Sequence, residues 1–165
     1  MAQTASIVAE KFRGFLTANE NGIGAAVAAL SGTSGIDAPV VPPENVVHQN
    51  APIAIAERSI AVKYPVVHVY CDRIQNLLVE KFRRFSGKVR TVAEIRVSQD
   101  RIEGLEEQTR LYVDAITQVL DQNRGSWDQG MFYTGGYEVK FEPVQHGGRN
   151  LLQIAKVIFE VDLSS

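Results

Sequence analysis

Hydrophobic and polar positions along the chain divide it into three regions. The first runs to about residue 31, and within it the apolar side chains of residues 7–16 recur at spacings of one, three and four, which gathers them on one face of a helix. The segment at residues 19–22 (Asn-Glu-Asn-Gly) interrupts this pattern, because Asn and Gly favour caps and turns over helix interiors. We therefore predict an N-terminal helical segment over residues 1–31, in which a second, alanine-rich helix covers Ile23–Leu30.

Residues 32–60 have the composition of an extended arm. They hold four of the six prolines, and Glu44 is the only formal charge between Pro39 and Pro52. Proline fixes φ and lacks the amide hydrogen, so neither a long helix nor a central strand is expected here. The arm is also too apolar for a solvated tail. We predict that it lies on a surface, either of its own domain or of a neighbouring subunit.

Residues 61–165 show the pattern of a folded α+β core. Four runs are apolar or alternate with a period of two, as strands do: 66–70, 89–97, 137–142 and 155–163. The turn-forming residues 147–150 between the last two runs predict an antiparallel hairpin. The stretch 74–85 fits a helical face, a strand or irregular structure, and these alternatives stay open.

One long amphipathic helix is predicted between the second and third of these strands. Asp100 and Glu103 have the spacing of a capping box, and apolar residues then follow at steps of three and four to about Asn123, before Gly125. The expected fold is α+β: an antiparallel β-sheet of about four strands, flanked by the N-terminal helix and the long central helix, with an extended proline-rich arm. The three regions form one domain overall.

Composition narrows the function classes. The 165 residues carry a formal net charge of -2, so the chain lacks the basic excess of a dedicated nucleic-acid binder. Cys71 is the only cysteine, which excludes an intrachain disulfide. No secretory signal begins the sequence, and no apolar run approaches the roughly 20 residues of a membrane helix. We expect a soluble protein assembled in a reducing compartment, without a membrane partner.

The search for catalytic groups finds no established motif. Phosphate-loop, dinucleotide-binding and nucleophile-elbow patterns are missing, as is any paired Cys/His spacing for a metal. His48, His68 and His146 are scattered over the arm, a strand and a turn. The glycine-rich residues 31–35 lack the lysine of a phosphate loop, and we interpret them as a flexible joint. The expectation is no catalytic residue, no cofactor and no metal.

Two segments are candidates for protein contacts. Residues 125–137 place Trp127 and Phe132 in a glycine-rich loop, where aromatic groups either anchor an interface or fold back on the core. A basic run that includes Arg83 and Arg84 fits an acidic protein surface, a nucleic acid or an ordinary solvated face. Because the long helix is acidic, we hypothesise that it neutralises this run on an adjacent subunit.

The order of five segments resembles a known family. They are residues 64–69, 86–87, 112–116, 135–139 and 159–162. Over about residues 60–165 the chain resembles the tail terminator (tail completion) proteins of tailed bacteriophages and related neck proteins.

The resemblance implies a structural virion protein that is not an enzyme. Such subunits form a homo-oligomer, a hexameric ring that caps the tail tube protein, stops its elongation and docks the tail to neck or connector proteins. DNA would pass through the lumen without specific binding. The expected location is the tail–neck junction of the virion, after assembly in the host cytoplasm.

Two alternatives stay open. Another neck ring, a stopper or head-completion connector, would use different docking surfaces on a similar small fold. A hot-dog-fold enzyme acting on acyl thioesters also wraps an antiparallel sheet around one long helix. In that case Glu103, Glu106 or Asp114 would supply the catalytic carboxylate.

Overall fold

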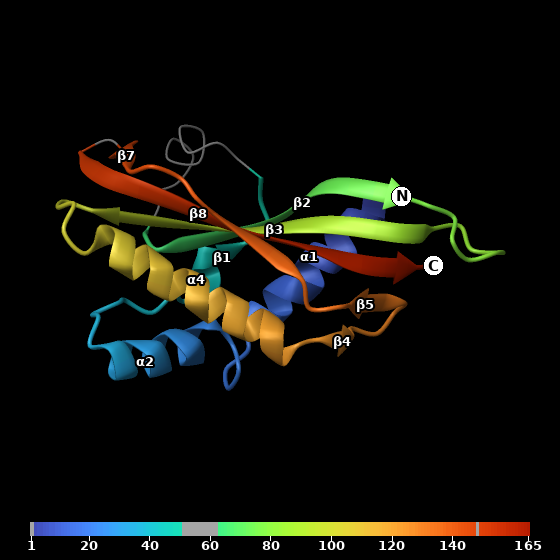
Figure 1. Ribbon diagram of the computed structural model, residues 1–165, viewed down its shortest axis with the longest axis horizontal. Coiled ribbons are helices and arrows are strands. Elements are labelled where there is room, and N and C mark those ends of the chain that lie inside the picture. Colours follow the sequence, from blue (N-terminus) through green and yellow to red (C-terminus); the bar gives the residue numbers. More distant parts are fainter. Residues whose placement is uncertain (1, 51–62, 148) are drawn as a thin grey trace.

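Three long strands form the centre of the structure, a computed structural model that describes residues 2–50, 63–147 and 149–165 (Figure 1). In these ranges the chain has mixed α/β architecture, with three α-helices and an eight-stranded sheet. The elements are α1 (Ala2–Leu16), α2 (Ile23–Ser34), the 3₁₀ turn η1 (Pro43–Asn45), β1 (Val46–Val47), β2 (Val66–Asn76), β3 (Ser86–Gln99), α4 (Leu105–Gln122), β4 (Gly125–Ser126), β5 (Met131–Tyr133), β6 (Tyr137–Phe141), β7 (Gln145–Gly147) and β8 (Asn150–Ser164).

The sheet order is β1-β2-β3-β8-β5-β4, with β6 and β7 also paired to β8. The outer edge of β8 therefore carries β7, β6 and β5 one after another. All pairs are antiparallel except β1 with β2, so the sheet is mixed. The prediction of about four antiparallel strands is wrong in number, because the additional strands are too short to show a period of two.

The predicted C-terminal hairpin is confirmed. Gly147 pairs with Asn150 beside the turn, and β6 continues the pairing from Phe141 with Ala155 to Tyr137 with Phe159. Between β2 and β3, where the sequence left three possibilities, β2 runs on to Asn76 and a loop covers residues 77–85.

The helices lie on one face of the sheet, with α1 and α4 directly on the strands and α2 packed against α4 (Figure 1). Helix α1 packs on β2 and β3, and α4 packs on β3 and β8. Apolar residues of all three helices and of the central strands form a single buried cluster. Phe12 of α1 meets Phe159 of β8 edge to face, with ring centroids 4.7 Å apart. Both helices predicted to flank the sheet therefore share one core.

The N-terminal segment agrees with the prediction, with one correction. Helices α1 and α2 are separated at residues 19–22, as the sequence indicates. However, α2 continues to Ser34 and ends at Gly35, whose φ of 72° is the left-handed conformation typical after a helix. The interpretation of residues 31–35 as a flexible joint is therefore wrong, since most of them are helical.

The described part of the arm lies on its own domain. Val41 and Val46 are buried in the common core. The Tyr112 hydroxyl of α4 donates a hydrogen bond to the Pro39 carbonyl (2.5 Å), and Arg13 Nε of α1 donates to the Val46 carbonyl (2.6 Å). The arm was predicted to lie either on its own domain or on a neighbouring subunit, and these residues lie on their own domain. Residues 51–60 of the predicted arm lie outside the described residues.

The central helix begins later than predicted. It starts at Leu105, and Gly104 before it has a φ of 79°, so no side chain caps the helix and the predicted box of Asp100 with Glu103 is wrong. A left-handed residue cannot lie inside an α-helix, so residues 100–104 form a turn. This turn leaves Ile102 60% exposed.

Gly87 controls how closely β2 approaches β3. A Cβ atom at this position would lie 1.9 Å from the backbone oxygen of Gln75, so Gly87→Ala forces the two strands apart. We expect a loss of about 1–3 kcal/mol in the free energy of unfolding, measured by urea denaturation. Gly32→Ala is the matched control, because Gly32 is in α2 with open space around it and alanine is the better helix former. Equal stability of the two variants would contradict the prediction.

Candidate functional site

The loop between β2 and β3 carries the most exposed apolar side chains of the described chain. It lies at one end of the molecule, beyond the last paired residues of the hairpin (Figure 1). Phe82 is fully exposed (104%) and Val79 is 73% exposed. We call this the hairpin-tip surface, and it consists of Leu77, Leu78, Val79, Phe82 and, from β5, Phe132. Contiguous apolar side chains in solvent mark interaction sites more often than isolated ones do.

The backbone of this loop is held by specific hydrogen bonds. Asn76 Oδ1 accepts from the amides of Leu78 (3.2 Å) and Ser86 (3.1 Å). On the other side, the amides of Arg84 and Phe85 donate to the Ser165 carbonyl at 2.9 and 3.0 Å. The loop shape is therefore defined by groups outside its tip, and its apolar side chains face solvent.

Two bulky residues of the loop have left-handed backbone conformations. The φ angles are 48° at Leu78 and 66° at Phe82, a region that costs a residue with a large side chain about 1–2 kcal/mol. Burial of the side chain does not offset this backbone cost at either residue, because both side chains are more than 60% exposed. Strain that stability does not require indicates a functional constraint.

Phe132 extends the apolar surface from the loop onto the sheet. Together with Leu77 and Val79 it lines an open hollow of about 330 Å³ at the end of β3 and β8. Its side chain is 49% exposed, and its role as an interface anchor stays a prediction. Arg83 and Arg84 lie on the same loop, so the structure brings three of the four predicted interface residues to one end of the molecule.

Trp127, the fourth predicted interface residue, lies in the core. It is 2% exposed, its indole Nε1 donates to the Asn123 carbonyl (2.6 Å), and its ring contacts Phe12, Phe15 and Tyr133. Of the two possibilities for the aromatic loop, Trp127 folds back on its own domain and is not available as an anchor.

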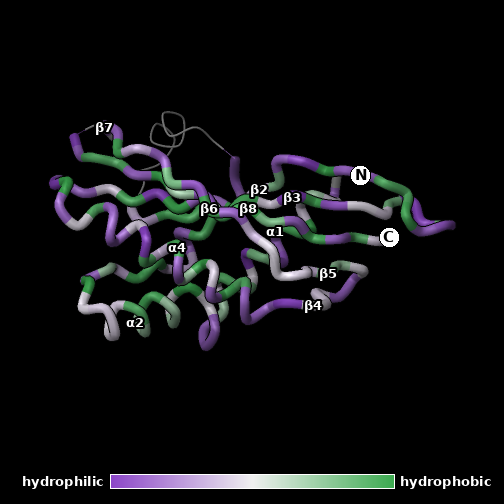
Figure 2. The backbone as a smooth tube through the Cα atoms, viewed as in Figure 1, coloured by the Kyte–Doolittle hydropathy of each residue, from purple (hydrophilic) through white to green (hydrophobic). Residues whose placement is uncertain are grey.

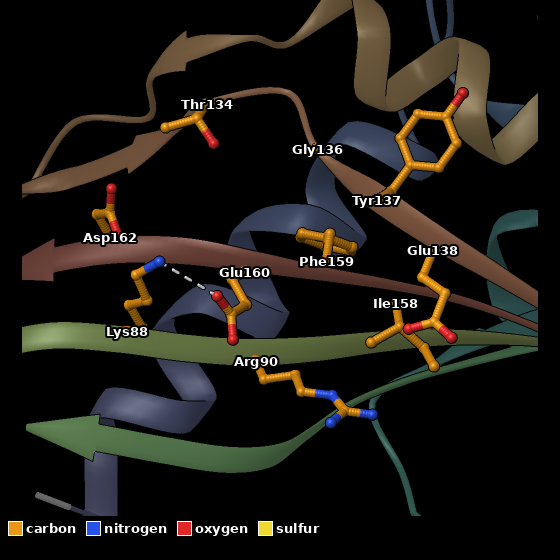
Figure 3. Close-up of a pocket in the computed structure, with 10 residues that line it drawn as sticks. All are labelled: Lys88, Arg90, Thr134, Gly136, Tyr137, Glu138, Ile158, Phe159, Glu160 and Asp162. Carbon is orange, nitrogen blue, oxygen red and sulfur yellow. Dashed lines mark hydrogen bonds and ion pairs between the residues drawn. The ribbon is translucent and has the colours of Figure 1, made fainter.

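A second hollow, of about 340 Å³, lies across the sheet between β3, β8 and the segment leading into β6 (Figure 3). Charged groups line it, and the cations are paired: Lys88 lies 3.4 Å from Glu160, and Arg90 lies 3.4 Å from Asp72. Arg73 also contacts Glu160, at 2.9 Å. The hollow is therefore a network of opposite charges, and among the described residues that line it no hydrogen bond joins a hydroxyl group to a base.

The carboxylates considered for acyl-thioester chemistry lie on the solvent side of α4 and of the turn before it. Glu103, Glu106 and Asp114 are exposed, and Glu106 pairs with Arg110 at 2.6 Å. The three histidines lie in different segments: His68 is in β2, His146 is in β7, and His48 follows β1 and contacts Glu10 at 3.3 Å. Within the described ranges, no group of three or more His, Cys, Asp or Glu residues is placed to hold a metal ion.

A buried polar cluster lies on the sheet face opposite the helices. Glu94 and Arg96 of β3 form an ion pair of 2.8 Å, and the Tyr70 hydroxyl donates to Glu94 at 2.8 Å. His68 is 3% exposed, with Nδ1 at 3.2 Å from the Gln49 carbonyl. Burial, and then the positive charge of Arg96, lower the pKa of His68 below its ordinary 6.5.

This lowered pKa predicts a loss of stability in mild acid. Below pH 6.5 the unfolded chain protonates His68 while the folded chain resists, so the free energy of unfolding falls as the pH decreases. Urea denaturation at pH 7.5 and 5.5 at constant ionic strength should show a smaller difference between the two pH values for His68→Gln than for the wild type. If the free energy of unfolding changes equally between the two pH values in both proteins, His68 is not the group responsible.

Of the hairpin-tip surface, only Phe132 was predicted from the sequence; the exposed apolar residues of the loop itself were not. Leu77, Leu78, Phe82 and Phe85 fit a helical face, and only Phe85 is buried. The available signal was the contiguous apolar run 77–79 directly before a basic run. Figure 2 shows this change from hydrophobic to hydrophilic residues along the loop.

Comparisons with known proteins do not assign the chain to a family. No protein-family model matches the chain, and no curated protein sequence matches it. None of the helices in the described part of the chain has both the length and the apolar character needed to cross a membrane.

Proposed function

We propose that the chain is a structural virion protein: a tail terminator that forms a ring, caps the phage tail tube, stops its elongation and docks the tail to the neck. The observation that carries this proposal is the hairpin-tip surface. Its apolar side chains are fixed in solvent by a strained, hydrogen-bonded loop, which is an arrangement suited to a protein contact.

The fold is compatible with the resemblance on which the proposal also rests. A small subunit with a sheet flanked by helices is what the phage family implies, and this chain has a helical layer on one face of a large sheet. The net charge of -2 suits a ring whose lumen passes DNA, because a strongly basic wall would bind phosphates tightly.

Native mass spectrometry combined with negative-stain microscopy tests the proposal. We expect a hexamer that appears as a ring with an open centre. A stable dimer or tetramer without a ring would overturn the proposal. If the isolated protein is a monomer, it is mixed with growing tail tubes, and tubes that continue to elongate would likewise contradict a terminator.

The same preparation separates a terminator from another neck ring. A terminator binds the end of purified tail tubes, whereas a stopper or head-completion connector binds the neck side and leaves tube growth unchanged. Tube length distributions, measured with and without the protein, therefore distinguish the two roles.

A further inference from the structure

The loop that carries the hairpin-tip surface is basic as well as apolar. Residues 77–85 contain three cations, Lys81, Arg83 and Arg84, against one carboxylate, Glu80. Glu80 is occupied: it lies 3.4 Å from Arg83 and accepts a hydrogen bond from the Ser164 hydroxyl. The side chains of Lys81 and Arg84 are exposed and form no ion pair with any residue the structure describes. The apolar tip is therefore bordered by positive charge without a partner.

The start of α4 has the opposite character. Residues 100–110 contain four carboxylates against two guanidinium groups. Glu106 is paired with Arg110, whereas Glu103 and Glu107 are exposed and make no ion pair within the described ranges. Ile102, which is 60% exposed, lies in the turn directly before α4. This end of the molecule thus combines an exposed apolar side chain with unpaired negative charge, and we call it the α4-start surface (Ile102, Glu103, Glu107).

These two surfaces cannot meet within one chain. They lie at opposite ends of β3, whose 14 residues span about 45 Å at the usual strand rise. Figure 1 shows the hairpin loop at one end of the molecule and the turn before α4 at the other. Contact between them requires a second molecule.

We infer that the hairpin-tip surface of one copy docks on the α4-start surface of a second copy. Phe82 packs against Ile102 at the centre, and Lys81 and Arg84 face Glu103 and Glu107 at the rim, an apolar centre with a charged border as in known interfaces. The inference deepens the proposed ring and rests on it for its biological setting.

The symmetry of this contact agrees with a ring. Two different surfaces of the same chain meet, so the contact is heterologous, and repeated head-to-tail contacts close into a ring when the rotation between copies allows it. An anionic membrane is the other surface that a basic, apolar loop fits. The acidic, apolar counterpart at the far end of the same chain favours a second copy.

Charge exchange between the two surfaces tests the inference on the full-length protein. Lys81→Glu with Arg84→Glu, and separately Glu103→Lys with Glu107→Lys, should each raise the dissociation constant between copies by about a hundredfold, since like charges then face each other. The combination of all four substitutions should restore assembly. Glu20→Lys, at an exposed turn remote from both surfaces, should leave assembly unchanged. Native mass spectrometry and analytical ultracentrifugation give the readout.

Mixed cross-linking provides a second test that does not depend on ring closure. In a Cys71→Ser background, the Phe82→Cys protein mixed with the Ile102→Cys protein should form a disulfide-linked pair under mild oxidation. Replacement of the second partner by the Phe141→Cys protein should abolish the pair. A predominant link between two Phe82→Cys copies would overturn the inference, because it indicates a symmetric contact.

The outcomes separate the two proposals. Rings that persist in both charge-reversed proteins would overturn this contact and leave the terminator proposal intact. An 82-to-102 link in open filaments that do not cap tubes would support the contact and overturn the terminator. A wild-type protein that remains monomeric with and without tubes would overturn both. Monomer binding to anionic phosphatidylserine vesicles that is lost on Lys81→Glu with Arg84→Glu, without the 82-to-102 link, would assign the loop to a membrane instead.

Discussion

Replacement of Trp127 by alanine is expected to destabilise the protein by about 3–5 kcal/mol, the usual cost of removing a buried aromatic side chain. Trp127 is 2% exposed and lies among the rings of Phe12, Phe15, Tyr133 and Phe159, at centroid distances from 5.0 to 6.2 Å. The substitution also removes the donor to the Asn123 carbonyl, at the end of α4. The Trp127→Ala substitution therefore weakens the packing between α1, α4 and β8 around this side chain.

The measurement is urea denaturation followed by far-UV circular dichroism, because Trp127 is the single tryptophan and its fluorescence is lost with it. Phe132→Ala, in the neighbouring strand β5, serves as the control. The Phe132 side chain is 49% exposed, and substitutions of surface residues usually change stability by less than about 0.5 kcal/mol. A loss below about 1 kcal/mol for Trp127→Ala would contradict its place in the core and return it to the candidate interface residues.

The parts of the fold that were predictable are those in which local pattern and burial agree. Along residues 155–163 of β8, alternate residues such as Val157, Phe159 and Val161 belong to the core shared with the helices, so the sequence carries the period of two in this part of the strand. The break between α1 and α2 is likewise visible in residues 19–22 alone. In both places the controlling interactions involve residues close in sequence.

The parts that were missed depend on distant residues or on very short elements. Strands β4 and β5 have two and three residues, too few to show a period, and they exist because β5 pairs with the end of β8. The capping box at Asp100 was locally plausible, but Gly104 adopts a left-handed conformation and delays the helix.

The apolar loop of the candidate site, and the grouping of its residues at one end of the sheet, were missed for the same physical reason. Apolar residues at 77, 78, 82 and 85 are compatible with a helix, and the decisive contacts come from Asn76 and from Ser165, the latter 80 residues beyond Phe85 in the chain. Arg83, Arg84 and Phe132 were identified individually, yet nothing in their spacing shows that β8 brings them to one end of the sheet. Proximity of this kind is set by strand pairing.

Phe82→Asn is expected to abolish assembly without loss of stability in the isolated subunit. The Phe82 side chain is fully exposed, and its φ of 66° suits asparagine better than phenylalanine. The free energy of unfolding should therefore stay unchanged or rise by up to about 1 kcal/mol, a shift of roughly 2–4 °C in Tm for a chain of this size. An interface that buries the Phe82 ring would lose about 1.5–3 kcal/mol per contact, or roughly 10- to 150-fold in affinity.

Phe141→Asn is the control that shows whether the effect on assembly is specific to Phe82. Phe141 is also an exposed aromatic residue, at 47%, but it lies in β6, outside the hairpin-tip surface and in a paired strand where asparagine is unfavourable. This control should lose some stability and retain assembly, the reverse of Phe82→Asn. Thermal denaturation together with analytical ultracentrifugation of both variants provides the measurement. If Phe82→Asn lowers Tm and leaves the oligomer intact, Phe82 stabilises the fold of its own chain, and the strained loop has no role in assembly.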